Sequence, residues 1–142
     1  MPLAGEVYHY PAYVFPDGEQ ANKFVVLLGQ ISGGDWILGR TTSRQRGRPM
    51  NPPCNQSEHF PSFYLGPLNG IFLAQTWLVL DRLDDHDQTD FVGAIRSGAV
   101  ELVGALPLQL LCAALSCARG AEDTTQFQAE AMSDLRAALG CV

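Results

Sequence analysis

The 142-residue sequence has little charge and no long apolar run. Charged residues make up 17% of the chain and hydrophobic residues 46%, which is too apolar for a disordered chain and ordinary for a globular one. No apolar run approaches the ~20 residues that a membrane-spanning helix needs. No basic stretch followed by an apolar run marks a signal peptide near the N-terminus. These absences predict a cytoplasmic protein without a membrane span.

Cysteine is scarce, and its spacing shows no metal or disulfide framework. Four cysteines occur, at Cys54, Cys112, Cys117 and Cys141, and no pair has CxxC spacing. Cys112 and Cys117 lie five residues apart in a helical stretch, so their side chains point in different directions. We therefore expect four reduced cysteines, three acting as small apolar helix residues and one as a loop thiol. Reduced thiols again favour a cytoplasmic setting.

Positive charge is also scarce, but it is concentrated. The net charge of −6 argues against a general nucleic-acid binder. However, Arg40, Arg44, Arg46 and Arg48 fall within nine residues, with no acid among them, and they are four of the nine basic residues. A cluster that no neighbouring acid neutralises favours binding of a negatively charged partner.

The acidic residues gather elsewhere, and five of the fifteen lie within residues 81–90. Within this run, Asp84-Asp85-His86-Asp87 has the composition of a metal or acid–base site, but consecutive side chains diverge. We interpret these residues as solvated acids of a turn and a helix start. The three histidines, His9, His59 and His86, have no metal-ligand spacing. Neither a metal ion nor another cofactor is expected.

The first half of the chain contains short strand patterns separated by turn residues. Lys23–Gln30 (KFVVLLGQ) is a continuous apolar run of the right length for a strand buried on both faces. Ser32-Gly33-Gly34-Asp35 then predicts a turn, which makes a hairpin with Trp36–Arg40. Gly39 in the returning strand indicates a bulge or a close approach. The other predicted strands are Glu6–Tyr10, Tyr13–Phe15, Ser62–Leu65, Ile71–Leu73 and Thr76–Leu80.

The second half is mainly helical. Asp90 is a suitable cap for a helix over Phe91–Ser97, and a strand over Ala99–Leu106 follows. A helix runs from Pro107 to Gly120 and another from Asp123 or Thr124 to about Leu139. The last helix has a stripe that we expect to be buried, made of Phe127, Ala131, Leu135 and Leu139.

Together these patterns predict one α+β domain over residues 1–142. Five or six short strands with tight turns, over about residues 5–80, favour a small, strongly bent antiparallel barrel. A mixed helix and strand tail covers about residues 90–140. The long irregular segment 41–70 carries the arginines and aromatic residues that could stack bases or simply pack, Phe60, Phe63 and Tyr64.

The order of five motifs resembles the PemK/MazF group of toxins from type II toxin–antitoxin systems. Gly5-Glu6-Val7 resembles that family's opening Gly-Asp-Ile/Val, and Glu19-Gln20 followed by Lys23–Leu27 resembles its Glu-Gln and Arg-Pro-Val-Leu-Val stretch. Gly39–Ser43 is similar to its strand ending in a threonine. Thr76–Asp87 is similar to its late strand with an acidic turn. The resemblance covers about residues 5–105 and leaves the last helix outside.

This resemblance implies a function as well as a fold. The family forms SH3-like barrels that pair as homodimers, and many members cut single-stranded RNA without a metal. An arginine and a threonine act on the scissile phosphate, and the tail of an antitoxin protein binds across the RNA groove. The family's Arg-Pro is Lys23-Phe24 here. Either Lys23 replaces that arginine, an arginine of the following loop does, or the activity is lost.

The hairpin brings the candidate residues to one place. Lys23 opens one strand and Thr41 closes the other, so in an antiparallel pair they could face one phosphate. Arginine binds phosphate oxygens bidentately, lysine can give or take a proton, and a threonine hydroxyl can donate to a phosphorane oxygen. The candidate catalytic residues are Lys23, Thr41, Thr42 and Arg44. The candidate RNA-binding residues are Arg40, Arg46, Arg48, Phe63 and Tyr64.

Two other functions are compatible with the same sequence. The barrel could be a non-catalytic module that binds RNA or a partner peptide through loop 40–48, which the Lys23-Phe24 departure favours. Alternatively, the chain could be an antitoxin-like or phage-linked regulator whose helical tail is the working surface.

Overall fold

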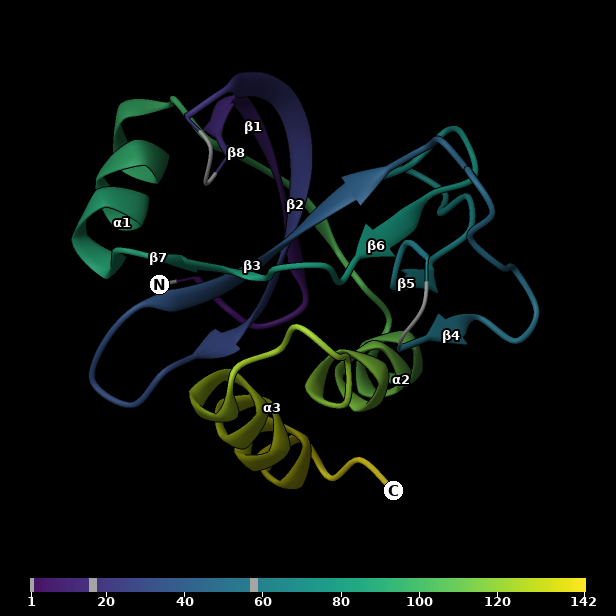
Figure 1. The fold of residues 1–142 in the computed structure, drawn as a ribbon. Coiled ribbons are helices and arrows are strands. Elements are labelled where there is room, and N and C mark those ends of the chain that lie inside the picture. Colours follow the sequence, from purple (N-terminus) through teal and green to yellow (C-terminus); the bar gives the residue numbers. More distant parts are fainter. Residues whose placement is uncertain (1, 16–17, 57–58) are drawn as a thin grey trace.

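The computed structural model describes residues 2–15, 18–56 and 59–142, which form an eight-stranded antiparallel sheet and three helices (Figure 1). The predicted α+β class is confirmed. The strands are β1 Glu6–Val14, β2 Gln20–Gln30, β3 Trp36–Thr42, β4 Cys54–Asn55, β5 Ser62–Tyr64, β6 Trp77–Val79, β7 Asp84–His86 and β8 Glu101–Ala105. The helices are α1 Gln88–Ser97, α2 Leu108–Arg119 and α3 Gln126–Leu139.

β3 is the strand that divides the sheet. The strand order is β4-β5-β6-β3-β2-β1-β8, and β7 pairs with β3 outside this path. The first half of β3, Trp36–Leu38, pairs with β7, whereas its last residues, Thr41 and Thr42, pair with β6. The two ends of β3 therefore have different neighbours.

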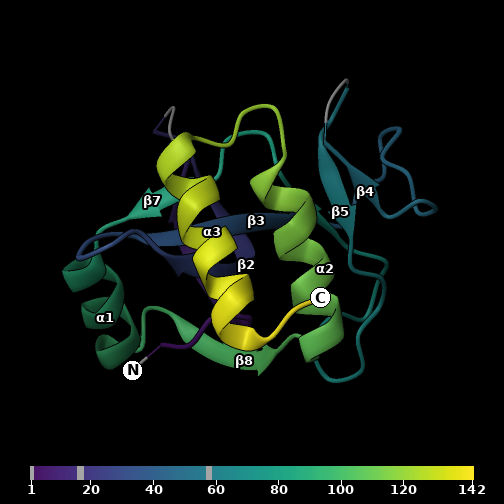
Figure 2. The ribbon, with the colours of Figure 1, turned by 90° about the horizontal axis from the view of Figure 1, so that it is seen from below.

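The sheet is covered by helices on both faces. α2 and α3 lie side by side against one face, and α1 lies on the other (Figures 1 and 2). Val26 and Leu28 of β2 enter the core with α2 and α3, whereas Val25 and Leu27 enter the core with α1. The prediction that Lys23–Gln30 is buried on both faces is confirmed, and this explains its continuous apolar sequence. Gly39 lies where an added Cβ would be 2.6 Å from Leu78, so the predicted close approach is also present.

Two local predictions for the sheet are wrong. Asp84–His86 is not a solvated turn but a strand, because its backbone pairs with Trp36–Leu38. Three consecutive polar residues hide the alternation that would mark a strand. Conversely, residues 71–73 form no strand; a tight turn over residues 68–71 leaves only an isolated bridge between Leu68 and Phe72.

The helix caps differ from the predicted ones by a few residues. Asp87, not Asp90, caps α1 by accepting from the Asp90 N–H. Thr125 caps α3 in a reciprocal capping box with Gln128. The predicted buried stripe of α3 is also wrong at its start, because Phe127 is 70% exposed while Met132 is fully buried. None of the helices formed by the described residues has the length and apolarity that crossing a bilayer requires.

The prediction of reduced cysteines is wrong. Cys54 of β4 is bonded to Cys117 of α2, and Cys112 of α2 is bonded to Cys141 near the C-terminus. The partners are 63 and 29 residues apart, so their proximity arises only from the docking of β4 and of the C-terminal segment on α2. As predicted, Cys112 and Cys117 point in different directions, but each reaches its own partner. Disulfides persist mainly in oxidising compartments, which removes the cysteine argument for a cytoplasmic location.

Candidate nucleic-acid interface

A pocket of about 600 Å³ lies at the end of β3 that is distant from β7. Three segments far apart in the sequence line it: residues 22–24 of β2, residues 41–48 at the end of β3 and in the loop that follows, and residues 71–76. We call it the basic pocket. The predicted catalytic residues all line it, namely Lys23, Thr41, Thr42 and Arg44. The predicted meeting of these groups at one rim of the hairpin is therefore observed.

One wall of the basic pocket is cationic. Lys23, Arg44, Arg46 and Arg48 line it, and no aspartate or glutamate does. Within the described residues, no ion pair joins any of these four cations to a carboxylate. Four of the nine basic side chains of an acidic protein thus face one space that no carboxylate lines. Such a site attracts anions.

The pocket also has an apolar lining, which the sequence did not reveal. It consists of Ile71, Phe72, Leu73 and Ala74. Leu73 is fully exposed, although buried Phe72 anchors the segment beside it. Ile71 packs so closely over Gly104 of β8 that an added Cβ there would be 2.7 Å away. The one sequence signal was Asn69-Gly70, a dipeptide typical of tight turns, which precedes the segment.

Lys23 carries a charge that its surroundings disfavour. Burial lowers the pKa of Lys23, and the nearby positive charges of Arg40, Arg44 and Arg48 lower it further. Its Nζ lies 5.9 Å from the centroid of the Phe15 ring. A bound anion would relieve this repulsion, so electrostatics favours an anionic ligand beside Lys23.

The two threonines differ in what their hydroxyls can do. The buried Thr41 hydroxyl donates to the carbonyl oxygen of Phe24 at 2.7 Å. Its single proton is therefore used within the sheet. The Thr42 hydroxyl oxygen accepts from the Arg44 N–H at 3.2 Å, which leaves its own proton available to a ligand. Of the two, Thr42 is the better donor to a phosphate.

Arg48 shapes the loop that carries the other arginines. Its side chain is 8% exposed, and its guanidinium donates to the carbonyl oxygen of Arg44 at 2.8 Å. The guanidinium also lies 5.0 Å from the centroid of the Phe60 ring. Its Nε is buried and has no partner among the described atoms. Burial lowers the pKa of Arg48, so this cation too is held at a cost that an anion would offset.

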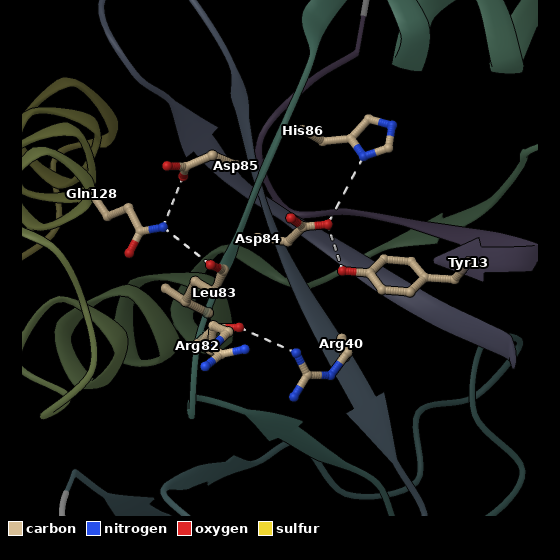
Figure 3. Close-up of polar contacts among 8 residues, drawn as sticks. All are labelled: Tyr13, Arg40, Arg82, Leu83, Asp84, Asp85, His86 and Gln128. Carbon is tan, nitrogen blue, oxygen red and sulfur yellow. Dashed lines mark hydrogen bonds and ion pairs between the residues drawn. The ribbon is translucent and has the colours of Figure 1, made fainter. Parts of the chain in front are cut away.

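Three predicted RNA-binding residues lie outside the basic pocket. Arg40 does not line the pocket, because its guanidinium donates to the carbonyl oxygen of Arg82 (Figure 3) and forms an ion pair with Asp81 at 3.5 Å. Phe63 is 2% exposed in the core with α2 and α3, so its ring has no face open to a base. Tyr64 packs against Trp77 at a centroid separation of 5.3 Å. We exclude these residues from the site.

The acidic run forms a different kind of cluster (Figure 3). Asp84 accepts from the Tyr13 hydroxyl at 2.7 Å and lies 3.9 Å from Nδ1 of His86, while Asp85 accepts from Gln128 at 2.8 Å. Burial raises the pKa of Asp84, but His86 and the Tyr13 hydrogen bond outweigh it and hold the pKa below its usual range. In the parts of the chain that the structure describes, no group of three or more histidine, cysteine, aspartate or glutamate side chains is arranged to hold a metal ion.

The chain is thus an α+β protein with a cationic pocket at the end of a central strand. Comparison with family models, with curated proteins and with solved structures gives no match.

Proposed function

We propose that the basic pocket binds a phosphate of single-stranded RNA and that the chain cleaves RNA there without a metal, as PemK/MazF toxins do. The observation that carries this proposal is the meeting of Lys23, Thr42, Arg44 and Arg46 around one space of about 600 Å³ that no acid lines. A phosphodiester places its charge where these donors converge.

The cationic and the apolar lining residues of the pocket suit the two parts of a nucleotide. The arginines and Lys23 face the charged phosphate, and Arg44 and Arg46 are exposed enough to adjust to it. The apolar segment from Ile71 to Ala74 faces the base or ribose. A free phosphate or sulfate would leave this wall unused, so the pocket favours a nucleic acid over an inorganic anion.

The same residues can carry out a balanced transesterification. The 2′-oxygen attacks phosphorus, its proton leaves to solvent, and the bond from phosphorus to the 5′-oxygen breaks. Arg44, Arg46 and the Thr42 hydroxyl stabilise the charge on the non-bridging oxygens. Lys23 donates its proton to the departing 5′-oxygen, which its lowered pKa favours. The products are a 2′,3′-cyclic phosphate and a 5′-hydroxyl.

The remaining features of the resemblance belong to the same proposal. These are closure of the bent sheet into an SH3-like barrel, pairing as a homodimer, and inhibition by the tail of an antitoxin that would occupy the pocket. A cytoplasmic location would place the protein beside its RNA. The disulfides fit a more oxidising setting than the cytoplasm. The proposed cleavage uses none of the four cysteines, so it does not require either setting.

A second candidate function is RNA binding without cleavage. Two observations favour it: the Thr41 hydroxyl is engaged by Phe24, and the Arg48 guanidinium is engaged by loop carbonyls. Fewer hydrogen-bond donors then remain free for catalysis than the sequence indicates. The positive charge that binding requires is still present.

One experiment separates the two candidates. Purified protein is incubated with labelled single-stranded RNA in the presence of a chelator, and the product ends are analysed. We expect cyclic-phosphate ends from RNA and none from the matching DNA, which lacks the 2′-hydroxyl. Thr42→Val and Lys23→Met should slow cleavage more than they weaken binding. Arg96→Gln in α1, which removes one charge far from the pocket, is the matched control.

The outcomes are distinct. RNA that is bound but left intact by the wild type would exclude cleavage and support the binding module. RNA that is not bound at all would exclude both functions.

A further inference from the structure

The loop that carries the arginines is attached covalently to a helix. We call residues 43–53, between β3 and β4, the basic loop. At its C-terminal end lies β4, which consists of two residues and, among the described strands, pairs with β5. Cys54, the first of these, is bonded to Cys117 in α2. The basic loop is thus fixed by a β3 end on one side and by a disulfide on the other.

Weaker contacts surround this covalent attachment. The Gln56 side-chain amide donates to the carbonyl oxygen of Cys117 at 3.2 Å, and the Glu122 N–H donates to the carbonyl oxygen of Gln56 at 2.9 Å. Within the loop, the Trp77 indole donates to the carbonyl oxygen of Pro49 at 3.0 Å. Single hydrogen bonds that solvent can replace contribute little net stability. The disulfide is a covalent restraint on the position of β4, and it adds to the backbone pairing of Cys54 and Asn55 with β5.

The second disulfide has no part in this attachment. Cys112 and Cys141 join α2 to the segment after α3, and neither residue belongs to the basic loop or to the lining of the basic pocket. The chain therefore offers a matched pair of disulfides, of which only one restrains the proposed binding site.

We propose that the Cys54–Cys117 disulfide is a redox-sensitive clamp that holds the basic loop in its RNA-binding arrangement. This inference rests on the proposed function and adds regulation to it. Oxidised protein binds RNA tightly, because the backbone that carries Arg44 and Arg46 is already held beside the pocket. Reduced protein must order this backbone on binding, and its affinity is lower.

The chemistry of release is ordinary thiol–disulfide exchange with a dithiol. A dithiol thiolate attacks the sulfur of Cys54, which is half-buried, whereas Cys117 is 2% exposed. The bond between the two cysteine sulfurs breaks and a mixed disulfide forms. The second thiol of the dithiol resolves it, so two electrons and two protons produce thiols at Cys54 and Cys117, and the dithiol becomes a disulfide.

The test measures RNA affinity by fluorescence anisotropy with and without dithiothreitol. Wild-type protein should lose about five- to tenfold in affinity on reduction, because the loop backbone must then be ordered on binding. Cys112→Ser/Cys141→Ser should respond in the same way. Cys54→Ser/Cys117→Ser should bind weakly in both conditions and should not respond.

A second measurement follows the loop itself and does not depend on RNA. Trypsin cleaves faster where the backbone is less restrained, so reduction should accelerate cleavage after Arg44 and Arg46 in the wild type. Absence of RNA binding by oxidised wild type would overturn the proposed function. The trypsin assay would then still test whether the disulfide restrains the basic loop. Unchanged loop cleavage and unchanged affinity on reduction would overturn the clamp, whatever the stability of the variants.

Discussion

The charged side chains at the two ends of β3 differ in whether they have partners within the protein. At the β7 end, the carboxylates of Asp84 and Asp85 each accept a hydrogen bond from a side chain of another element (Figure 3). At the other end, Lys23, Arg44 and Arg46 face a pocket that no acid lines. Charges that find partners inside the molecule support the fold, whereas charges left without partners are available to a ligand.

The pKa shifts at the two ends express the same difference. Although burial opposes it, the surroundings of Asp84 favour its charged form, and its pKa lies below the usual range. The surroundings of Lys23 disfavour its charged form, through burial and then through repulsion by arginines. At the acidic end, groups of the protein itself therefore stabilise the charged form of Asp84. At the basic end, the charged form of Lys23 would be stabilised by a bound anion.

The largest effect should come from removing charge at the basic end. Arg44→Gln/Arg46→Gln should weaken binding of single-stranded RNA about 100-fold, since each charge-assisted hydrogen bond contributes roughly 1.5 kcal/mol. The dependence of log affinity on log salt should become shallower by about 0.7 for each lost phosphate contact. Anisotropy titrations at several salt concentrations measure both quantities.

The control for this prediction is Arg96→Gln together with Arg119→Gln, which changes the net charge equally but lies in α1 and α2. If both double variants lose the same affinity, attraction by overall charge explains binding and the basic pocket is not the site.

A smaller effect, on stability, should follow from removing a carboxylate at the acidic end. Asp84→Ala leaves the buried Tyr13 hydroxyl without its acceptor and should lower the free energy of unfolding by about 1–3 kcal/mol. RNA affinity should remain unchanged, because Asp84 does not line the basic pocket. Urea denaturation and anisotropy on the same samples test this separation. A parallel loss of affinity would show that the two ends are coupled through β3.

The pH dependence of this effect has a definite sign. The pKa of Asp84 is lower in the folded state than its ordinary value of 3.8, so its contribution to stability is fully present above that value. It is lost as the pH falls through the folded pKa. The stability difference between wild type and Asp84→Ala should therefore shrink below about pH 4. A difference that grows in acid would contradict the shift.

The sequence revealed one end of β3 better than the other, for physical reasons. The hairpin of Lys23–Gln30 with Trp36–Arg40 follows from a continuous apolar run and a glycine turn, and it locates the basic pocket. The strand at Asp84–His86 has no alternation to reveal it, because its side chains are polar on both faces. The apolar wall around Leu73 and the disulfide of Cys54 depend on contacts between segments far apart, which spacing does not encode.

The smallest effect should come from Phe127→Ala on α3, and comparison with its neighbour Gln128 tests how this helix supports the acidic end. Periodicity predicts that Phe127 is buried, and removing a buried phenylalanine would cost about 3–5 kcal/mol. In the structure Phe127 is 70% exposed, so Phe127→Ala should change the free energy of unfolding by less than about 0.5 kcal/mol. Gln128→Ala should cost more, about 1–3 kcal/mol, because Gln128 donates to Asp85 and to the carbonyl oxygen of Leu83. Denaturation of the two variants gives the order directly; a larger loss for Phe127→Ala would mean that α3 packs with its other face and that the Asp85 contact is absent.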